Sequence, residues 1–210
     1  MKYYQLPLGP LGTNCYIVYN DKKECVIIDP GEESAKLISF IKQKDLQPLA
    51  VLLTHAHFDH IGALDAVRDT FKIEAYVHEK EKKWLTDSHL NGSQRFMMGN
   101  AVQVRSAEHV ITEEGTLAIG NFTFEVYETP GHSPGSVSFY LREDGYLFSG
   151  DVLFQGSVGR TDLPGGSMNV LMESIQQKIL CLPLNTIVFP GHGPLTLIED
   201  EMHSNPFLRG

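Results

Sequence analysis

Residue types that bind metals are concentrated in one short stretch of the chain. His55, His57, Asp59 and His60 lie within six positions, directly after an apolar run at residues 49–53. Imidazole and carboxylate groups are common protein ligands of zinc, iron and manganese. One or two such histidines would be unremarkable on a surface or in a core. Four ligand-type residues at the end of one apolar strand indicate a metal site.

The spacing of these four residues predicts two ions. Alternate side chains of a strand point to the same face, so His55 and His57 can bind one ion. Asp59 and His60 follow where we expect a helix to begin, with Asp59 as its cap, and they would face a second position nearby. Two ions need more than four ligands, so the others must come from elsewhere in the chain.

Three further ligand-type residues each follow a predicted strand. His132 and His192 stand in Pro-Gly-His turns, and Asp151 stands in a Ser-Gly-Asp turn. A turn glycine lets the backbone approach closely and place a side chain over the end of a sheet. We therefore expect these residues to converge with the first four on one rim.

Short strands and a few helices are predicted to position these residues. Runs rich in Tyr, Val and Ile predict an antiparallel meander over residues 3–29, and apolar spacing predicts a helix over 33–44. The first motif is then preceded by a strand over 49–53 and followed by a helix over 61–71. After a brief strand at residues 75–77, we expect a hairpin over 117–127, a second hairpin of strands 137–141 and 146–148, a helix over 169–180 and a last strand over 186–189.

Two segments after the first motif have no clear role in the sequence. Residues 79–85 are rich in Lys and Glu and are expected to form a solvated face. Residues 86–104, which include Met97 and Met98, have a weak pattern. This stretch is either a lid over a pocket or a surface loop, and we favour the surface loop.

Composition predicts one compact domain over residues 1–210, because 210 residues that are 42% hydrophobic can bury a large core. A net charge of -9 would repel a phosphate backbone, so no nucleic-acid partner is expected. The first residues do not predict a signal peptide and no apolar run approaches about 20 residues, so no membrane partner is expected. The 3 widely spaced cysteines fit reduced thiols in the cytoplasm. The oligomeric state is left open.

These motifs resemble the metallo-β-lactamase superfamily, whose H-x-H-x-D-H signature stands here at residues 55–60. The later P-G-H, S-G-D and P-G-H motifs occur in the order typical of that family. The resemblance implies an α+β fold of the αββα sandwich type. Two mixed β-sheets would face each other, helices would cover the outer faces, and the metals would lie along one edge.

The resemblance also implies a ligand set for two divalent metal ions, with zinc preferred and iron or manganese as alternatives. The first ion would be held by His55, His57 and His132, the second by Asp59, His60 and His192, and Asp151 would bridge them. The histidine at position 57 excludes the diiron flavoprotein branch, which carries a glutamate there. Candidates to orient the imidazoles are Asp29, Thr54 and Ser133.

A dinuclear centre of this kind implies hydrolysis. Two divalent ions lower the pKa of a shared water, so a metal-bound hydroxide held by Asp151 would be available near neutral pH without a separate base. Asp59 would help to orient it, and the hydroxide would attack a substrate carbonyl whose developing charge the metal stabilises.

Within the superfamily the chain is most similar to the short form of the glyoxalase II group, on residues 156–162 and 205–208. That group hydrolyses S-2-hydroxyacyl-glutathione thioesters, which implies a small-molecule thioester of glutathione or another thiol carrier as substrate. The helical C-terminal domain of the larger enzymes is expected to be missing, and Pro194 stands where they have a tyrosine. Arg160 replaces a lysine of those enzymes, so it either binds a substrate anion or pairs with Asp162.

Three alternatives remain open at this level. A persulfide dioxygenase of the same superfamily shares a similar G-R-T-D loop but uses a single iron and oxygen. A lactonase or nuclease of the same fold is a further alternative, and the acidic surface counts against the nuclease. A non-catalytic binding module is disfavoured by the seven ligand positions.

Overall fold

The structure, a computed structural model, describes residues 1–97, 99 and 101–209. Met98 and Asn100, both in the predicted lid or loop segment, lie outside the described residues, as does Gly210. The chain divides into two compact units, Met1–Thr112 and Glu113–Gly210. The expectation of a single domain over residues 1–210 stays a prediction.

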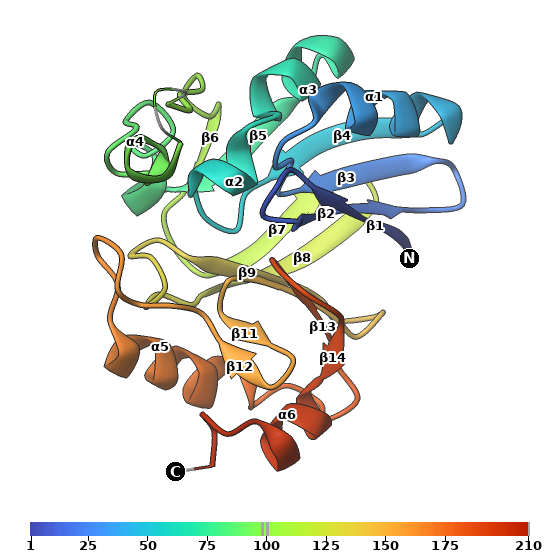
Figure 1. The fold of residues 1–210 in the computed structure, drawn as a ribbon. Helices are drawn as coiled ribbons and strands as arrows, with labels where there is room; N and C mark the ends of the chain where they lie inside the picture. Colours follow the sequence, from blue (N-terminus) through green and yellow to red (C-terminus); the bar gives the residue numbers. More distant parts are fainter. Residues whose placement is uncertain (98, 100, 210) are drawn as a thin grey trace. The chain divides into compact units, whose positions relative to one another are not determined.

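The first unit is built on a six-stranded mixed sheet whose strands follow one another in chain order (Figure 1). The strands are β1 (Lys2–Leu8), β2 (Thr13–Tyr19), β3 (Glu24–Ile28), β4 (Gln47–Leu52), β5 (Glu74–His78) and β6 (His109–Ile111). The first three pair antiparallel, which confirms the predicted meander, and β3 to β6 pair parallel. Parallel neighbours need long crossovers, and here the crossovers carry the helices.

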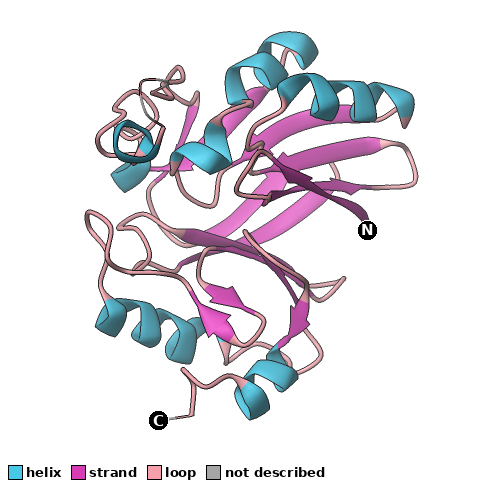
Figure 2. Ribbon diagram, in the orientation of Figure 1, coloured by secondary structure: helices cyan, strands magenta, loops and turns pink. Residues whose placement is uncertain are grey.

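The helices of the first unit are α1 (Ser34–Gln43), α2 (Phe58–Ile61), α3 (Leu64–Phe71), the 3-10 turn η1 (Glu79–Glu81) and α4 (Ser93–Phe96). Leu37 and Ile41 of α1, four residues apart, are buried, as are Leu64 and Val67 of α3. They join residues of the strands in one hydrophobic core. The predicted helix over 33–44 is therefore confirmed, and Figure 2 shows α1 and α3 as neighbouring cyan helices.

The predicted helix over residues 61–71 is wrong at its start, because the chain forms α2 and α3 with a break at Gly62. A Cβ on Gly62 would lie 2.7 Å from the carbonyl oxygen of Gly31, so the backbones at positions 31 and 62 can approach this closely only because residue 62 is glycine. The predicted cap is also wrong. Asp59 lies in the first turn of α2, whose N-cap is His57 and has no side-chain capping hydrogen bond.

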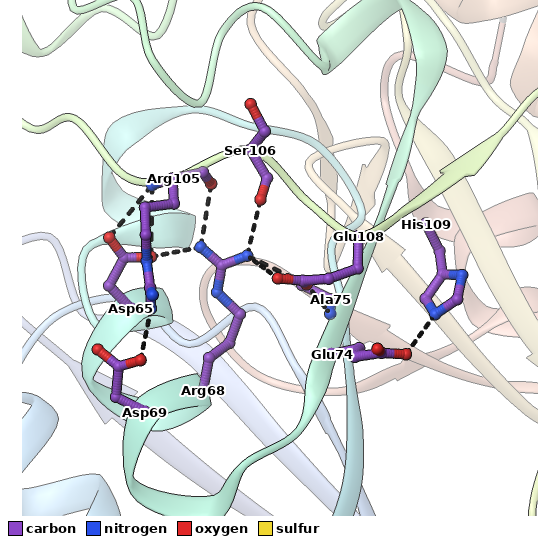
Figure 3. A network of polar contacts seen from close by, with 9 residues as sticks. All are labelled: Asp65, Arg68, Asp69, Glu74, Ala75, Arg105, Ser106, Glu108 and His109. Atoms are coloured by element: carbon purple, nitrogen blue, oxygen red, sulfur yellow. Dashed lines mark hydrogen bonds and ion pairs between the residues drawn. The ribbon is translucent and has the colours of Figure 1, made fainter.

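A buried arginine fixes the end of the long β5–β6 crossover, as Figure 3 shows. Arg68 of α3 donates to the carbonyl oxygens of Arg105 (3.0 Å) and Ser106 (2.9 Å), and to the carboxylate of Glu108 (3.0 and 3.1 Å). Arg68 also pairs with Asp65. The chain that enters β6 is thus held to α3 by charge-assisted hydrogen bonds.

The second unit is also built on a six-stranded mixed sheet, in the order β14-β13-β10-β9-β8-β7. The strands are β7 (Gly115–Ile119), β8 (Phe122–Glu128), β9 (Val137–Leu141), β10 (Tyr146–Gly150), β13 (Ile187–Pro190) and β14 (Thr196–Leu197). The predicted hairpins are confirmed. Only β10 and β13 pair parallel among the described strands of this sheet, so a crossover must join them.

This crossover contains the short hairpin β11 (Leu153–Phe154) and β12 (Ser157–Val158), then α5 (Met168–Ser174) and the π-helical turn η2 (Ile175–Ile179); α6 (Ile198–Ser204) follows the sheet. Leu171, Ile175 and Ile179 pack with strand residues in a second core. The predicted helix over 169–180 thus continues from α5 into η2. None of the helices among the described residues has the length and apolarity needed to cross a bilayer.

Candidate metal centre

The first unit brings three of the predicted histidines together where β4 leads into α2. The rings of His55 and His57 lie 4.8 Å apart between centroids, and those of His55 and His60 lie 4.1 Å apart. All three side chains are buried. The histidines of the first motif are therefore packed together as a buried cluster and are not exposed to solvent.

A carboxylate and a hydroxyl set the protonation of two of these rings. Asp29 Oδ2 lies 3.0 Å from Nδ1 of His60, and a carboxylate only accepts, so this nitrogen carries the proton. The Thr54 hydroxyl donates to Asp29 Oδ2 (2.6 Å), so at 3.1 Å it accepts from Nδ1 of His55. In both rings Nε2 is then the nitrogen that can bind a metal.

Asp59 is held in place by hydrogen bonding and close backbone packing. The Thr13 hydroxyl donates to Asp59 Oδ2 over 2.8 Å, and the same oxygen lies 3.5 Å from Nε2 of His60. A Cβ on Gly31 would lie 2.5 Å from the carbonyl oxygen of Asp59, so only glycine allows this approach. Burial, and then the nearby charge of Asp59, raises the pKa of the Glu32 carboxyl beside this turn.

Glu81 is a further residue of this cluster that sequence reasoning placed wrongly. The prediction gave residues 79–85 a solvated face, but Glu81 is fully buried. Its Oε2 accepts the backbone N–H of Ala56, between His55 and His57, over 3.0 Å. A charged residue in a charged run carried no signal of this role, because the contact joins residues 25 positions apart.

The second unit brings the other three predicted ligands together. Strands β8 and β10 both run antiparallel to β9, and β13 runs parallel to β10, so all three end at the same edge of the sheet. His132, Asp151 and His192 follow these ends. Asp151 Oδ2 lies 3.5 Å from Nε2 of His132 and 3.6 Å from Nε2 of His192. One carboxylate oxygen thus stands within reach of both imidazoles.

The loop after Asp151 orients His132. The carbonyl oxygen of Arg160 lies 2.8 Å from Nδ1 of His132, and because a carbonyl only accepts, this nitrogen carries the proton and Nε2 can bind a metal. The loop can pass this closely because position 159 is glycine. A Cβ on Gly159 would lie 1.9 Å from the carbonyl oxygen of Asp151.

Arg160 makes one of the two contacts proposed for it from the sequence, whereas Ser133 differs from its proposed role. The Arg160 side chain forms a double hydrogen bond with Asp162, with both distances 2.7 Å, so the loop-internal pairing is present. The Ser133 hydroxyl contacts that of Ser136 at 2.7 Å. Of the three proposed orienting residues, Asp29 and Thr54 hold imidazoles through the contacts described above.

The donor set of each cluster fits a divalent transition metal. The first unit offers three histidines and Asp59. Within it, Asp29, His55 and His60 each place one ligand-type atom within 4.8 Å of the other two. The second unit offers His132, Asp151 and His192. Zinc and iron sites use carboxylates and imidazole rings as ligands. A ring whose proton is fixed on Nδ1 can bind such a metal through Nε2.

Comparison with known proteins identifies relatives across nearly the whole chain. A model of the metallo-beta-lactamase superfamily matches residues 8–192. The probable metallo-hydrolase YqgX of Bacillus subtilis is 51% identical, covering 100% of this chain and 99% of that protein. The hydroxyacylglutathione hydrolase GloC of Haemophilus influenzae is 39% identical, covering 97% and 96%.

Two solved structures resemble the chain closely. The crystal structure of BLEG-1, a B3 metallo-beta-lactamase, is 58% identical with a TM-score of 0.98, covering 100% of both chains. The crystal structure of TTHA1623 in a di-iron-bound form is 40% identical with a TM-score of 0.85, covering 98% of this chain and 100% of that one. Together with the two mixed sheets, these matches confirm the predicted fold class.

Proposed function

Because the chain belongs to the metallo-β-lactamase superfamily, we propose that it hydrolyses small hydroxyacyl thioesters with a dinuclear metal centre. Superfamily membership and the relatives support a metal-dependent hydrolase in general. The observation that carries the thioester is the 39% identity to the hydroxyacylglutathione hydrolase GloC, which extends over 97% of this chain. The substrate we propose is a small molecule, the thioester of glutathione or another thiol. The free cysteines support a cytoplasmic location.

The proposed centre combines the clusters of the two units. His55, His57 and His132 would hold one ion, Asp59, His60 and His192 the other, and Asp151 would bridge both. Support comes from the chemistry of each cluster, since each places a carboxylate oxygen 3.5 or 3.6 Å from an imidazole Nε2. Neither cluster alone supplies the ligands that two ions need.

The chain's residues and the bound metal would divide the chemistry. When bound, divalent ions lower the pKa of a water and polarise a carbonyl oxygen. Asp59 and Asp151 would accept hydrogen bonds from the nucleophile and orient it. Asp29, Thr54 and the carbonyl of Arg160 would keep the imidazole protons on Nδ1 throughout turnover.

Zinc is the metal we propose, with iron as the alternative that the comparisons favour. The ligand types suit both metals. The likeness to TTHA1623 in its di-iron-bound form makes iron the more specific rival. Metal analysis distinguishes zinc from iron, if the protein is purified from cells grown with balanced amounts of both metals.

A panel of substrates tests the proposal. The protein reconstituted with zinc or iron would be assayed for hydrolysis of S-lactoylglutathione and of thioesters of other thiols. Oxygen uptake with a glutathione persulfide would be measured with an oxygen electrode. We expect two metal equivalents and thioester hydrolysis without oxygen uptake. One iron equivalent with oxygen uptake on the persulfide, and no hydrolysis, would replace the proposal with the dioxygenase.

A second candidate activity is hydrolysis of a β-lactam, favoured by the 58% identity to the B3 metallo-beta-lactamase BLEG-1. Both reactions add a nucleophile to an activated acyl carbonyl, so one centre can serve both. A chromogenic cephalosporin in the same panel measures this activity. The ratio of kcat/KM for thioester and β-lactam decides which is the main substrate.

The Asp151→Ala variant tests the shared ligand. We expect it to lose both metal retention and hydrolysis, because a bridging carboxylate serves two ions at once. Asp200→Ala, an exposed carboxylate of α6, is the matched control and should leave both unchanged. Full activity in Asp151→Ala would refute the bridging role.

A further inference from the structure

The pairing of Arg160 with Asp162 leaves open which cation recognises an anionic substrate. Arg95, at the end of α4, is exposed and forms no ion pair with any residue that the structure describes. Its guanidinium carbon lies 5.5 Å from the ring centre of Phe96, a residue that is 42% exposed. Although the protein has a net charge of -9, Arg95 places a positive charge on the surface, stacked on the exposed ring of Phe96.

The turn that carries these two residues is fixed by buried polar side chains. Asn91 donates to the carbonyl oxygens of Trp84 (3.1 Å) and Val102 (2.9 Å), and its own side-chain oxygen accepts the N–H of Ser93 (3.0 Å). The Ser93 hydroxyl accepts the N–H of Val102 over 2.9 Å. Residues 91–93 are buried, so the predicted surface loop is wrong there.

This turn is attached to the metal-ligand stretch itself. The N–H of Phe58, the residue between His57 and Asp59, donates to the carbonyl oxygen of Asn91 over 3.1 Å. The rings of Phe58 and Phe96 stack with centroids 6.1 Å apart and planes at 27°. The turn that carries Arg95 and Phe96 is thus held to the first cluster by a backbone hydrogen bond and an aromatic contact, both made by Phe58.

We propose that Arg95 and Phe96 form the carrier-binding element of the substrate site, which takes the carboxylate-bearing part of the thioester's thiol. This inference rests on the proposed function. Arginine pairs with a carboxylate through two parallel hydrogen bonds, and the ring beneath it restrains the guanidinium before binding. Phe96 supplies apolar contact for the chain that links this carboxylate to the sulfur.

Binding of a thioether that cannot be hydrolysed tests this assignment without turnover. S-hexylglutathione carries the carboxylates, and S-hexyl-N-acetylcysteamine lacks them. By calorimetry, Arg95→Gln should raise the Kd of the first about 10-fold, the value of one charge-assisted pair, and leave that of the second unchanged. Phe96→Ala should weaken both, and Phe96→Leu should recover part of the loss. Arg142→Gln is the control, because Arg142 pairs with Glu125 on the surface.

Each outcome bears on a different proposal. Equal S-hexylglutathione binding by wild type and Arg95→Gln would overturn the carrier-binding element, as would a loss confined to Arg160→Gln or no saturable binding by wild type. If binding depends on Arg95 but no thioester is hydrolysed, the carrier-binding element stands and the proposed hydrolase fails. Thermal melting of each variant shows that the fold is kept.

Discussion

Replacing Asp29 by asparagine tests how the first cluster sets the protonation of its histidines. Asp29 accepts the N–H of Thr54 (2.8 Å), the hydroxyl of Thr54 (2.6 Å) and Nδ1–H of His60 (3.0 Å). An asparagine oxygen can keep the first of these bonds. Its NH₂ group would then face the Thr54 hydroxyl and Nδ1–H of His60. Because NH₂ is itself a donor, neither group could still donate a hydrogen bond to residue 29.

The consequence would reach the rings of both candidate ligands, His55 and His60. The Thr54 hydroxyl would turn to donate to His55, and His60 would accept from the amide, so that both imidazole protons move to Nε2. An Nε2–H nitrogen cannot bind a metal. We therefore expect metal affinity to fall about 10- to 100-fold, as found when partners of ligating histidines are removed.

The stability cost also follows from these contacts. Hydrogen bonds to charged groups contribute about 1.5–3 kcal/mol each, so two weakened bonds should lower the free energy of unfolding of the apoprotein by about 3 kcal/mol. A domain with about 5–15 kcal/mol of stability remains folded after such a loss. Backbone strain does not interfere, because Asp29 has φ 51° and asparagine tolerates this region as well as aspartate does.

Two measurements on the apoprotein and one on the metal-loaded protein decide the outcome. Nitrogen NMR reports the histidine tautomers, chemical denaturation reports stability, and chelator competition reports metal affinity. Asp45→Asn is the matched control, because Asp45 is exposed and has φ 55°. Unchanged tautomers and unchanged metal affinity in Asp29→Asn would refute the reasoning.

Three further predictions concern packing, thiols and pH. Gly159→Ala should destabilise the protein by about 2–3 kcal/mol, seen in denaturant melts, because its Cβ would lie 1.9 Å from the carbonyl oxygen of Asp151; a neutral effect would contradict this packing. Of the three cysteines, only the exposed Cys181 should react with a thiol reagent in the native protein at pH 8, since the other two are buried and burial raises the pKa of their thiols; rapid labelling of more than one would contradict the burial. Burial opposes ionisation of Asp65, but the hydrogen bonds from Arg68 and from the backbone N–H of Arg105, together with the charges of both arginines, outweigh burial and lower the pKa of Asp65. Its stabilising effect is therefore present above the unfolded pKa of about 3.9 and lost as pH falls through the lower folded value, so the stability gap between wild type and Asp65→Asn should narrow between about pH 5 and pH 2; a constant gap would show that the pair does not titrate with folding.

The sequence by itself identified the candidate ligand residues and most of the elements around them. Four metal-binding residue types in six positions remain neighbours in any fold, and the structure accordingly packs His55, His57 and His60 together. Turn signals and apolar periods are equally local, so the meander, the hairpins and α1 were predicted close to their observed bounds.

Contacts between distant residues were decided only by the tertiary structure. The directions of β8, β10 and β13 place His132, Asp151 and His192 at one sheet edge, and strand direction is set by pairing along the whole sheet. Their meeting with the first cluster in one centre stays a prediction.

The same reason accounts for the errors. Glu81 looked solvated because its charged neighbours are, yet it is buried against Ala56. Asp59 has the residue type of a helix cap, but Thr13, 46 positions away, takes its carboxylate instead. A charged side chain is solvated, buried or paired according to which backbone donor or hydroxyl the fold brings to it, and local sequence does not contain that partner.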